Sequence, residues 1–205
     1  LVKNLFQHHH YLIRLAMIRH GHTAWNRAGR IQGRTDIALD ETATADLGKL
    51  CLPPEWAQAD VVSSPLQRAK RTAELISGRE PQIIDALIEM DWGDWEGQQG
   101  QVLRADAGSG FRDIEEWGWD FCPPQGESPK DVWERLKPWL ASLQQDTVAV
   151  CHIGTMRIIL ARAFGWKFRG AAPFQVKRNR LFVVEIDGET LRSSGDPVRL
   201  IGRNT

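Results

Sequence analysis

Short apolar runs alternate with amphipathic stretches along most of the chain. The runs predict β-strands, because each is brief and flanked by polar or turn-forming residues. The stretches between them repeat apolar positions at helical spacing. This alternation predicts an α/β domain with a largely parallel sheet covered on both faces. Strands are expected at residues 12–18, 60–63, 82–84, 147–151 and 181–186.

The helices carry recognisable start signals. Ser64 followed by Pro65 predicts an N-cap and first helical position, and Ser128 predicts a cap for a later helix. Pro138 lies inside that later helix, so a kink or break is expected there. Residues 91–126 are rich in Gly, Trp and acidic groups, which indicates loops and short helices. The expected helices span residues 42–50, 65–76, 129–143 and 155–164.

The length of 205 residues suits one domain, assigned to residues 13–205, after a tail of residues 1–12. The run His8-His9-His10 is interpreted as a tag remnant or solvated tail rather than a metal site. Apolar residues make up 42% and charged residues 25%, as in soluble proteins. No stretch has the length of a membrane span and none reads as a signal peptide, so a cytoplasmic protein without a membrane partner is expected.

The net charge and the cysteine content limit which partners and metal sites are expected. Lys plus Arg and Asp plus Glu both total 26, so the net charge is zero and nucleic acid is not an expected partner. Cys51, Cys122 and Cys151 lie far apart, which argues against a disulfide framework or a zinc ribbon. The predictions are therefore no metal and no cofactor. Cys151 lies in an apolar run and is expected in the core.

Three polar clusters fall at or just after predicted strands, at residues 19–23, 63–68 and 151–155. Ligands of such sheets bind beyond the carboxyl ends of the strands, so these clusters are expected to meet. Guanidinium groups and the free N–H groups of a helix start bind phosphate. A neutral histidine among them can attack phosphorus, giving a phosphohistidine that water later hydrolyses.

An acid is also needed to protonate the leaving alcohol. Residues 87–97 contain four carboxyl groups beside Trp92 and Trp95. Partial desolvation by these indoles favours a protonated general acid at neutral pH. Spacing alone does not choose among the candidates, which are Glu89, Asp91, Asp94 and Glu96.

Five blocks, in order, resemble the signature of the histidine phosphatase superfamily, also called the phosphoglycerate mutase-like family. They are RHGHTAWNRAGRIQGRTD, SSPLQRAKRTAELI, LIEMDWGDWEG, PPQGES and VAVCHIGTMRIIL. A single RHG tripeptide is weak, whereas five ordered blocks covering about residues 13 to 186 are specific.

The resemblance implies a three-layer α/β/α sandwich with a mostly parallel central sheet, and chemistry that needs no metal. It implies that His20 is the nucleophile and Glu89 the acid and later the base. Arg19, Arg68 and His152 would complete the phosphate pocket. Residues implied to touch or help hold the phosphoryl group or substrate are Asn26, Gly33, Thr23, Gln32 and Thr155.

Two positions depart from the family pattern. His22 stands where an acidic residue is usual, beside the expected pocket. A residue on the surface or just behind the pocket is the favoured interpretation, and an effect on substrate preference or on the ionisation of His20 is the alternative. A His-x-His metal site is disfavoured, because no further ligands accompany His20 and His22. Residues 38–40 read Ala-Leu-Asp instead of Pro-Leu-Thr or Pro-Leu-Ser, and Asp40 can still cap the next helix.

Three functions fit these residues. A phosphomonoesterase of the histidine acid phosphatase type, acting on small phosphorylated metabolites, is favoured. A cofactor-dependent phosphoglycerate mutase, an isomerase, is disfavoured because the segment 98–125 is short and its Arg104 and Arg112 are not adjacent. A non-catalytic phosphate-binding module is weakest, because every residue the chemistry needs is present. The compact form resembles broad-specificity and α-ribazole phosphate phosphatases of bacteria. The oligomeric state is left open, with a homodimer as one candidate.

Overall fold

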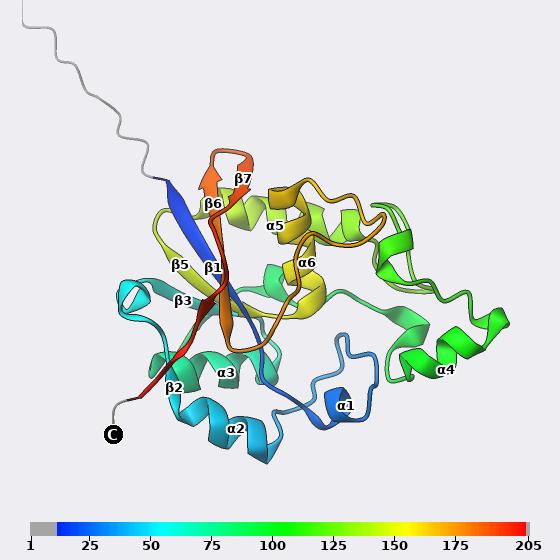
Figure 1. The fold of residues 1–205 in the computed structure, drawn as a ribbon, viewed down its shortest axis with the longest axis horizontal. Coiled ribbons are helices and arrows are strands. Elements are labelled where there is room, and N and C mark those ends of the chain that lie inside the picture. Colours follow the sequence, from blue (N-terminus) through cyan, green and yellow to red (C-terminus); the bar gives the residue numbers. More distant parts are fainter. Residues whose placement is uncertain (1–11, 204–205) are drawn as a thin grey trace, which may run out of the picture.

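The computed structural model describes residues 12–203, so the histidine run and most of the predicted tail lie outside the described residues. A seven-stranded sheet has the order β4-β3-β5-β1-β6-β7, with β8 paired to β6 (Figure 1). Strands β4, β3, β5 and β1 run parallel, and β6 joins antiparallel to β1. The strands of this sheet are β1 (Ile13–Arg19), β3 (Asp60–Ser63), β4 (Gln82–Ile83), β5 (Thr147–Cys151), β6 (Arg180–Asp187), β7 (Thr190–Ser193) and β8 (Val198–Arg199).

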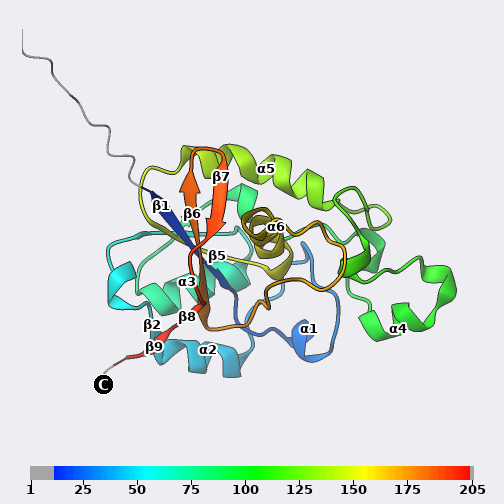
Figure 2. The same cartoon turned by 45° about the horizontal axis from the view of Figure 1, so that its top comes forward.

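Each face of the sheet supports its own apolar core. Along β1, Leu15 and Met17 pack into one core, and Ala16 and Ile18 into the other, as alternating side chains of a doubly covered strand must. Helices α5 (Pro129–Ser142) and α6 (Ile153–Phe164) cover the first face, and α2 (Glu41–Gly48) and α3 (Gln67–Ser77) cover the second (Figure 2). The three-layer α/β/α sandwich expected from the sequence is therefore confirmed, with an antiparallel edge added to the parallel strands.

Two helix starts differ from the predicted ones by two residues. Helix α3 begins at Gln67 rather than Pro65. Its N-cap is Leu66, which makes no side-chain cap bond, and the Ser64 hydroxyl accepts the Leu66 N–H before the helix begins. Helix α6 begins at Ile153, directly after His152. Pro138 does not break α5, which Ser128 caps as predicted. The helices are α1 (Ala24–Arg27), α2 (Glu41–Gly48), α3 (Gln67–Ser77), α4 (Gly100–Ala105), α5 (Pro129–Ser142) and α6 (Ile153–Phe164).

The remaining elements are short. Strands β2 (Leu50–Cys51) and β9 (Ile201–Gly202) form a small second sheet. Gly188 and Glu189 connect β6 to β7, and Asp187 pairs with Thr190, which forms the predicted hairpin. Within residues 12–203 no helix is long and apolar enough to cross a membrane. Single 3-10 turns occur at η1 (Pro54–Trp56), η2 (Asp85–Leu87), η3 (Gly93–Trp95), η4 (Ala107–Ser109) and η5 (Ile114–Glu116).

Candidate active site

The carboxyl ends of β1, β3 and β5 bring the three predicted clusters together. The backbone N–H of His20 donates to the Cys151 carbonyl at 3.0 Å, and that of Ser64 donates to the Val150 carbonyl at 3.0 Å. These bonds extend the sheet by one residue on either side of β5 and place His20 and Ser64 beside His152. The rings of His20 and His152 have centroids 5.1 Å apart, so the sheet itself creates the predicted histidine pair.

The His20 ring is held in one tautomer. Its Nδ1 lies 2.7 Å from the Gly21 carbonyl oxygen, which can only accept a hydrogen bond. Nδ1 therefore carries the proton, and Nε2 of the neutral ring carries the lone pair. His20 is only 3% exposed, so this orientation is fixed by packing as well as by the bond. A buried, neutral imidazole with a free Nε2 is the form that can act as a nucleophile.

His152 is oriented from the opposite side by Ser64. The His152 Nε2 lies 2.7 Å from the Ser64 hydroxyl oxygen, which already accepts the N–H of Leu66. When the hydroxyl donates to Nε2, the proton of the neutral ring lies on Nδ1. His152 Nδ1 is buried without a protein partner, so in this tautomer it is an available donor. Ser64, a residue without a predicted role beyond capping, is thus part of the site.

Unpartnered donors are concentrated at this place. Arg68 is fully buried and donates to the carbonyls of Gly33 and Thr35, and its Nε remains without a partner. Gln32 accepts from Thr23 through its carbonyl oxygen, so its buried amide nitrogen is left unpaired. Among the described residues, the buried side-chain polar atoms without a partner are Arg19 Nε, His22 Nδ1, Gln32 Nε2, Arg68 Nε and His152 Nδ1. A buried donor without an acceptor is costly, so this group suits an oxyanion.

The electrostatics of the site point the same way. Burial, and then the charges of Arg68 and Arg19, hold the pKa of His20 well below 6.5. Burial and then the charge of Arg178 lower the pKa of Arg19 to about 9. The pKa of His152 is also held well below 6.5, chiefly by burial. Both histidines therefore stay neutral while the arginines stay charged at neutral pH, and the crowded cations favour a bound anion.

The two buried histidines predict a protein that loses stability as the pH falls below 6.5. In that range the unfolded chain binds protons on both rings and the folded protein does not, so the free energy of unfolding decreases. Each histidine contributes at most about 1.4 kcal/mol for each pH unit. Thermal unfolding between about pH 7.5 and about pH 5.5 checks this, and the dependence should shrink in His152→Gln. A melting temperature that stays constant over this range in wild type contradicts the prediction.

Glu89 is the one carboxyl group of its segment that enters the site. It is 2% exposed and accepts from the backbone N–H groups of Met90, Gly154 and Thr155 at 2.8 to 3.0 Å. The N–H groups that open α6, which were expected to bind phosphate, thus bind Glu89 instead. This corrects the expectation, because a carboxyl group already accepts the free N–H groups at the first turn of α6. The Thr155 hydroxyl donates to the Ile88 carbonyl at 2.9 Å and lies 3.3 Å from Glu89 Oε1.

The other three carboxyl groups that spacing left open have different surroundings. Asp91 pairs with Arg34 at 3.6 Å and accepts the N–H of Gly93. Glu96 accepts the N–H groups of Arg34 and Thr35. Asp94 is exposed. These contacts hold the loops around the site and leave Glu89 as the buried carboxyl group beside the histidines.

The absence of a side chain at Gly154 leaves room for the Glu89 carboxyl group. A Cβ at this position would lie 2.5 Å from Glu89 Oε1, so Gly154→Ala must displace the carboxyl group. If Glu89 reacts as the resemblance implies, kcat/KM for an alkyl phosphate should fall by about 10- to 100-fold, because misplacing a reacting group is costly. Steady-state kinetics check this. Gly48→Ala, where a Cβ meets nothing within 4 Å, is the matched control, and equal activity in both variants would refute the prediction.

The remaining residues implied by the resemblance mostly build the surrounding loops. Thr23 caps α1, with a capping box shared with Asn26. Asn26 Oδ1 accepts from the Thr23 N–H and from Arg178 at 2.9 Å, so only its amide nitrogen is open. The Gly33 carbonyl accepts from Arg68 at 2.6 Å. These contacts hold Arg68 and the loop that follows His20.

Arg178 belongs to the site and was not predicted. Its Nε donates to the His20 carbonyl at 3.1 Å, and burial lowers its pKa to about 10. It precedes β6, which runs antiparallel to β1, so the start of β6 meets the end of β1. The pair Lys177-Arg178 just before a predicted final strand was the available signal, but only the strand direction gives it meaning.

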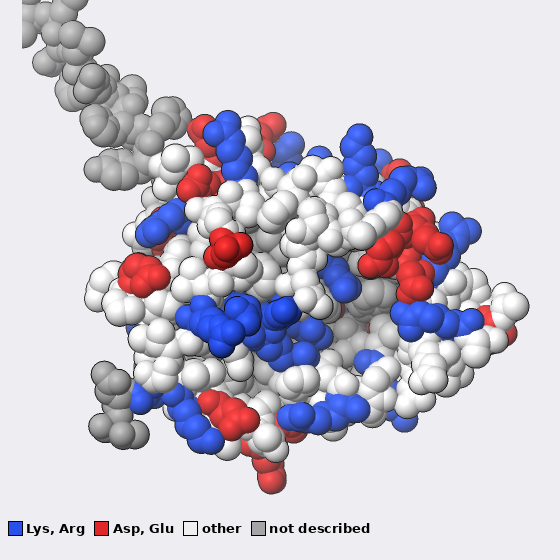
Figure 3. Space-filling model, in the orientation of Figure 1, with Lys and Arg blue, Asp and Glu red and all other residues white. Residues whose placement is uncertain are grey.

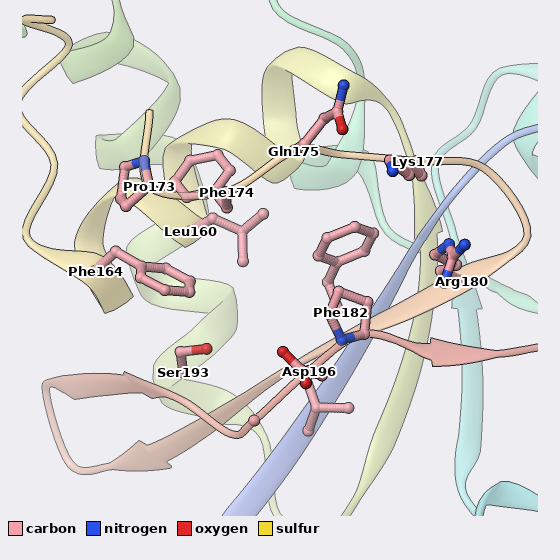
Figure 4. Close-up of a pocket in the computed structure, with 13 residues that line it drawn as sticks. Leu160, Phe164, Pro173, Phe174, Gln175, Lys177, Arg180, Phe182, Ser193 and Asp196 are labelled. Atoms are coloured by element: carbon pink, nitrogen blue, oxygen red, sulfur yellow. The ribbon is translucent and has the colours of Figure 1, made fainter. Parts of the chain in front are cut away.

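Figure 3 shows Lys and Arg side chains gathered around a hollow on the face formed by α1, α4 and the loop before β6. A separate cavity of 510 Å³ lies between α6 and the hairpin of β6 and β7. Leu160, Phe164 and Phe182 point into it, with Lys177 and Arg180 at one side (Figure 4). It contains none of the predicted site residues. Within residues 12–203 no three His, Cys, Asp or Glu side chains gather to hold a metal.

Comparison with known proteins places the chain in a family. Residues 15–195 match the model of the histidine phosphatase superfamily (branch 1). A phosphoglycerate mutase of Schizosaccharomyces pombe is 34% identical over 76% of this chain and 75% of its own. An adenosylcobalamin/alpha-ribazole phosphatase of Salmonella typhimurium is 32% identical over 77% and 85%. The crystal structure of a putative alpha-ribazole-5'-P phosphatase from Escherichia coli superposes with a TM-score of 0.74 at 26% identity, covering 95% and 100%. The chain belongs to the histidine phosphatase superfamily, branch 1.

Proposed function

We propose that this protein hydrolyses phosphate monoesters of small metabolites through a phosphohistidine formed on His20. The observation that carries the proposal is the fixed tautomer of His20, whose Nδ1 is bound to the Gly21 carbonyl. This leaves the Nε2 lone pair beside the unpartnered donors of Arg19, Arg68 and His152. A nucleophile and a set of oxyanion donors at one point are what phosphoryl transfer requires.

In the first step the phosphoryl oxygens accept from Arg19, Arg68 and His152. The His20 Nε2 lone pair attacks phosphorus, and the bond from phosphorus to the ester oxygen breaks. The leaving oxygen takes a proton from Glu89 and departs as the alcohol. Glu89 Oε2 accepts only the Gly154 N–H within the described residues, which leaves one lone-pair position of that oxygen for the proton.

In the second step water replaces the alcohol. Glu89, now a carboxylate, takes one proton from the water while the water oxygen attacks phosphorus. The bond from phosphorus to Nε2 breaks, and the electron pair returns to His20. Inorganic phosphate leaves, and the site is restored with Glu89 protonated.

The segment 98–125 supports hydrolysis rather than isomerisation. Arg104 pairs with Asp113 at 2.6 Å, and the Arg112 guanidinium lies 4.9 Å from the centre of the Phe121 ring. Both arginines of this segment are thus engaged with the protein, and they form no adjacent pair for a substrate carboxylate. The second candidate is a phosphoglycerate mutase, which the name of the Schizosaccharomyces pombe relative favours.

Phosphate release from a panel of esters in EDTA tests the proposal. The panel contains α-ribazole phosphate, 3-phosphoglycerate and simple alkyl phosphates. We expect release from at least one ester that chelation does not abolish. No release from any ester would contradict phosphatase activity. Conversion of 3-phosphoglycerate to its isomer, with a bisphosphoglycerate primer and without phosphate release, would establish the mutase instead.

A further inference from the structure

Two cavities meet at Arg157, and one of them is lined by Ile153, the residue directly after His152. A cavity of 330 Å³ opens toward α4, and one of 710 Å³ opens toward the loop before β6. Ile114, Glu115 and Arg157 line both of them. Arg157 lies on α6, five positions after His152, and its charge interacts with those of Glu89 and Arg19. The two cavities therefore provide the space into which a leaving group would extend.

Arg157 differs from the other arginines that line the 330 Å³ cavity. Arg30 donates to the Gly97 carbonyl at 2.7 Å. Arg104 is held by Asp113, and Arg112 by the ring of Phe121. In the part of the chain that the structure describes, Arg157 has no hydrogen bond, no ion pair within 4.0 Å and no aromatic ring beneath it. It alone presents an uncommitted guanidinium to the cavity.

An unpaired, partly buried guanidinium is costly to maintain. Burial lowers the pKa of Arg157, and the charges of Glu89 and Glu115 act against that effect without forming an ion pair. Glu89 is committed to the backbone of α6, and Glu115 is exposed at the rim. An oxyanion bound at Arg157 would offset the desolvation through a bidentate contact.

We propose that Arg157 determines specificity by binding an oxyanion, a carboxylate or a second phosphate, on the leaving group of the substrate. The inference rests on the proposed function, because it takes the reacting phosphoryl group to lie at His20. Glu89 protonates the leaving oxygen in that mechanism, and Arg157 interacts with Glu89, so it stands on the leaving-group side. The 710 Å³ cavity, lined there by Trp166, Ala172 and Phe174, has room for the rest of the leaving group.

Three esters that share the glycerol skeleton test this inference. Glycerol 3-phosphate carries no second anion, 3-phosphoglycerate carries a carboxylate, and glycerol 1,3-bisphosphate carries a second phosphate. We expect wild type to prefer one of the two charged esters, which identifies the oxyanion. Arg157→Gln should lower kcat/KM for that ester by about 10- to 100-fold and leave glycerol 3-phosphate within about 3-fold. Arg157→Lys should recover part of the loss, because it restores the charge but not the planar fork.

The controls separate the inference from the proposed function. Arg112→Gln removes a cation from the same cavity that is already held by Phe121, so the preference should be unchanged. Equal loss on all three esters in Arg157→Gln, or no loss on any, would overturn the role of Arg157. A wild type that prefers glycerol 3-phosphate would overturn it as well. A wild type that releases phosphate from none of these or the earlier esters would overturn the proposed function itself.

Discussion

Replacing His20 by alanine is expected to lower phosphate release by about 10⁴-fold or more, because the nucleophile is removed. The Nδ1 of His20 is committed to the Gly21 carbonyl, and no other histidine in the site combines a fixed proton on one nitrogen with a free Nε2. His152 cannot replace it, since its Nε2 faces Ser64. Phosphate release from the best ester of the panel, compared between the two proteins, measures the effect.

Inorganic phosphate supplies the control for this variant. Arg19, Arg68 and His152 remain in His20→Ala, so phosphate should still raise its melting temperature. A variant that binds phosphate without turning over esters has lost the nucleophile rather than the fold. Activity within about 10-fold of wild type would mean that another group attacks phosphorus.

Replacing Glu89 by glutamine is expected to slow substrates to different extents, according to their leaving groups. An alkyl oxygen needs a proton to depart, so kcat for an alkyl phosphate should fall by about 10² to 10⁴-fold. A nitrophenolate departs without a proton, so the first step with p-nitrophenyl phosphate should lose much less. Single-turnover release of the alcohol or phenol measures that step directly, since the second step also uses Glu89.

Asp94→Asn is the matched control for the acid. Asp94 comes from the same acidic segment but is exposed, so its amide should leave both leaving groups unaffected. Equal losses for the alkyl and nitrophenyl esters in Glu89→Gln would contradict the assignment, because a general acid must discriminate between them. Loss of the fold would appear as a lower melting temperature, since one backbone N–H at the start of α6 loses its acceptor.

The strands and the meeting of the three clusters could be predicted because they depend on local pattern. Buried runs such as residues 60–63 and 147–151 are strands with the predicted bounds. Parallel strands then end at one edge, which brings His20 and His152 together. The start of α3 could not be predicted from Ser64, because its hydroxyl accepts the N–H of Leu66, which lies before the helix, and also contacts the distant His152.

The identity of the acid and the role of Arg178 depend on contacts between segments far apart in the sequence. Glu89 reaches the first turn of α6, and Arg178 reaches His20 across the antiparallel pair of β1 and β6. Neither contact leaves a local signal, since a carboxylate beside tryptophans and a basic pair before a strand are common. The resemblance to the family selected Glu89, while Arg178 became visible only in three dimensions.

The central claim is a phosphoryl group bound covalently to His20. Rapid quenching of the enzyme with its best ester, followed by proteolysis and mass spectrometry under alkaline conditions, tests it most directly. We predict the added mass of one phosphoryl group on the peptide that contains His20, absent in the His20→Ala variant. Turnover with an unmodified His20 peptide throughout the reaction, or a phosphoryl group found on another residue, would contradict the account.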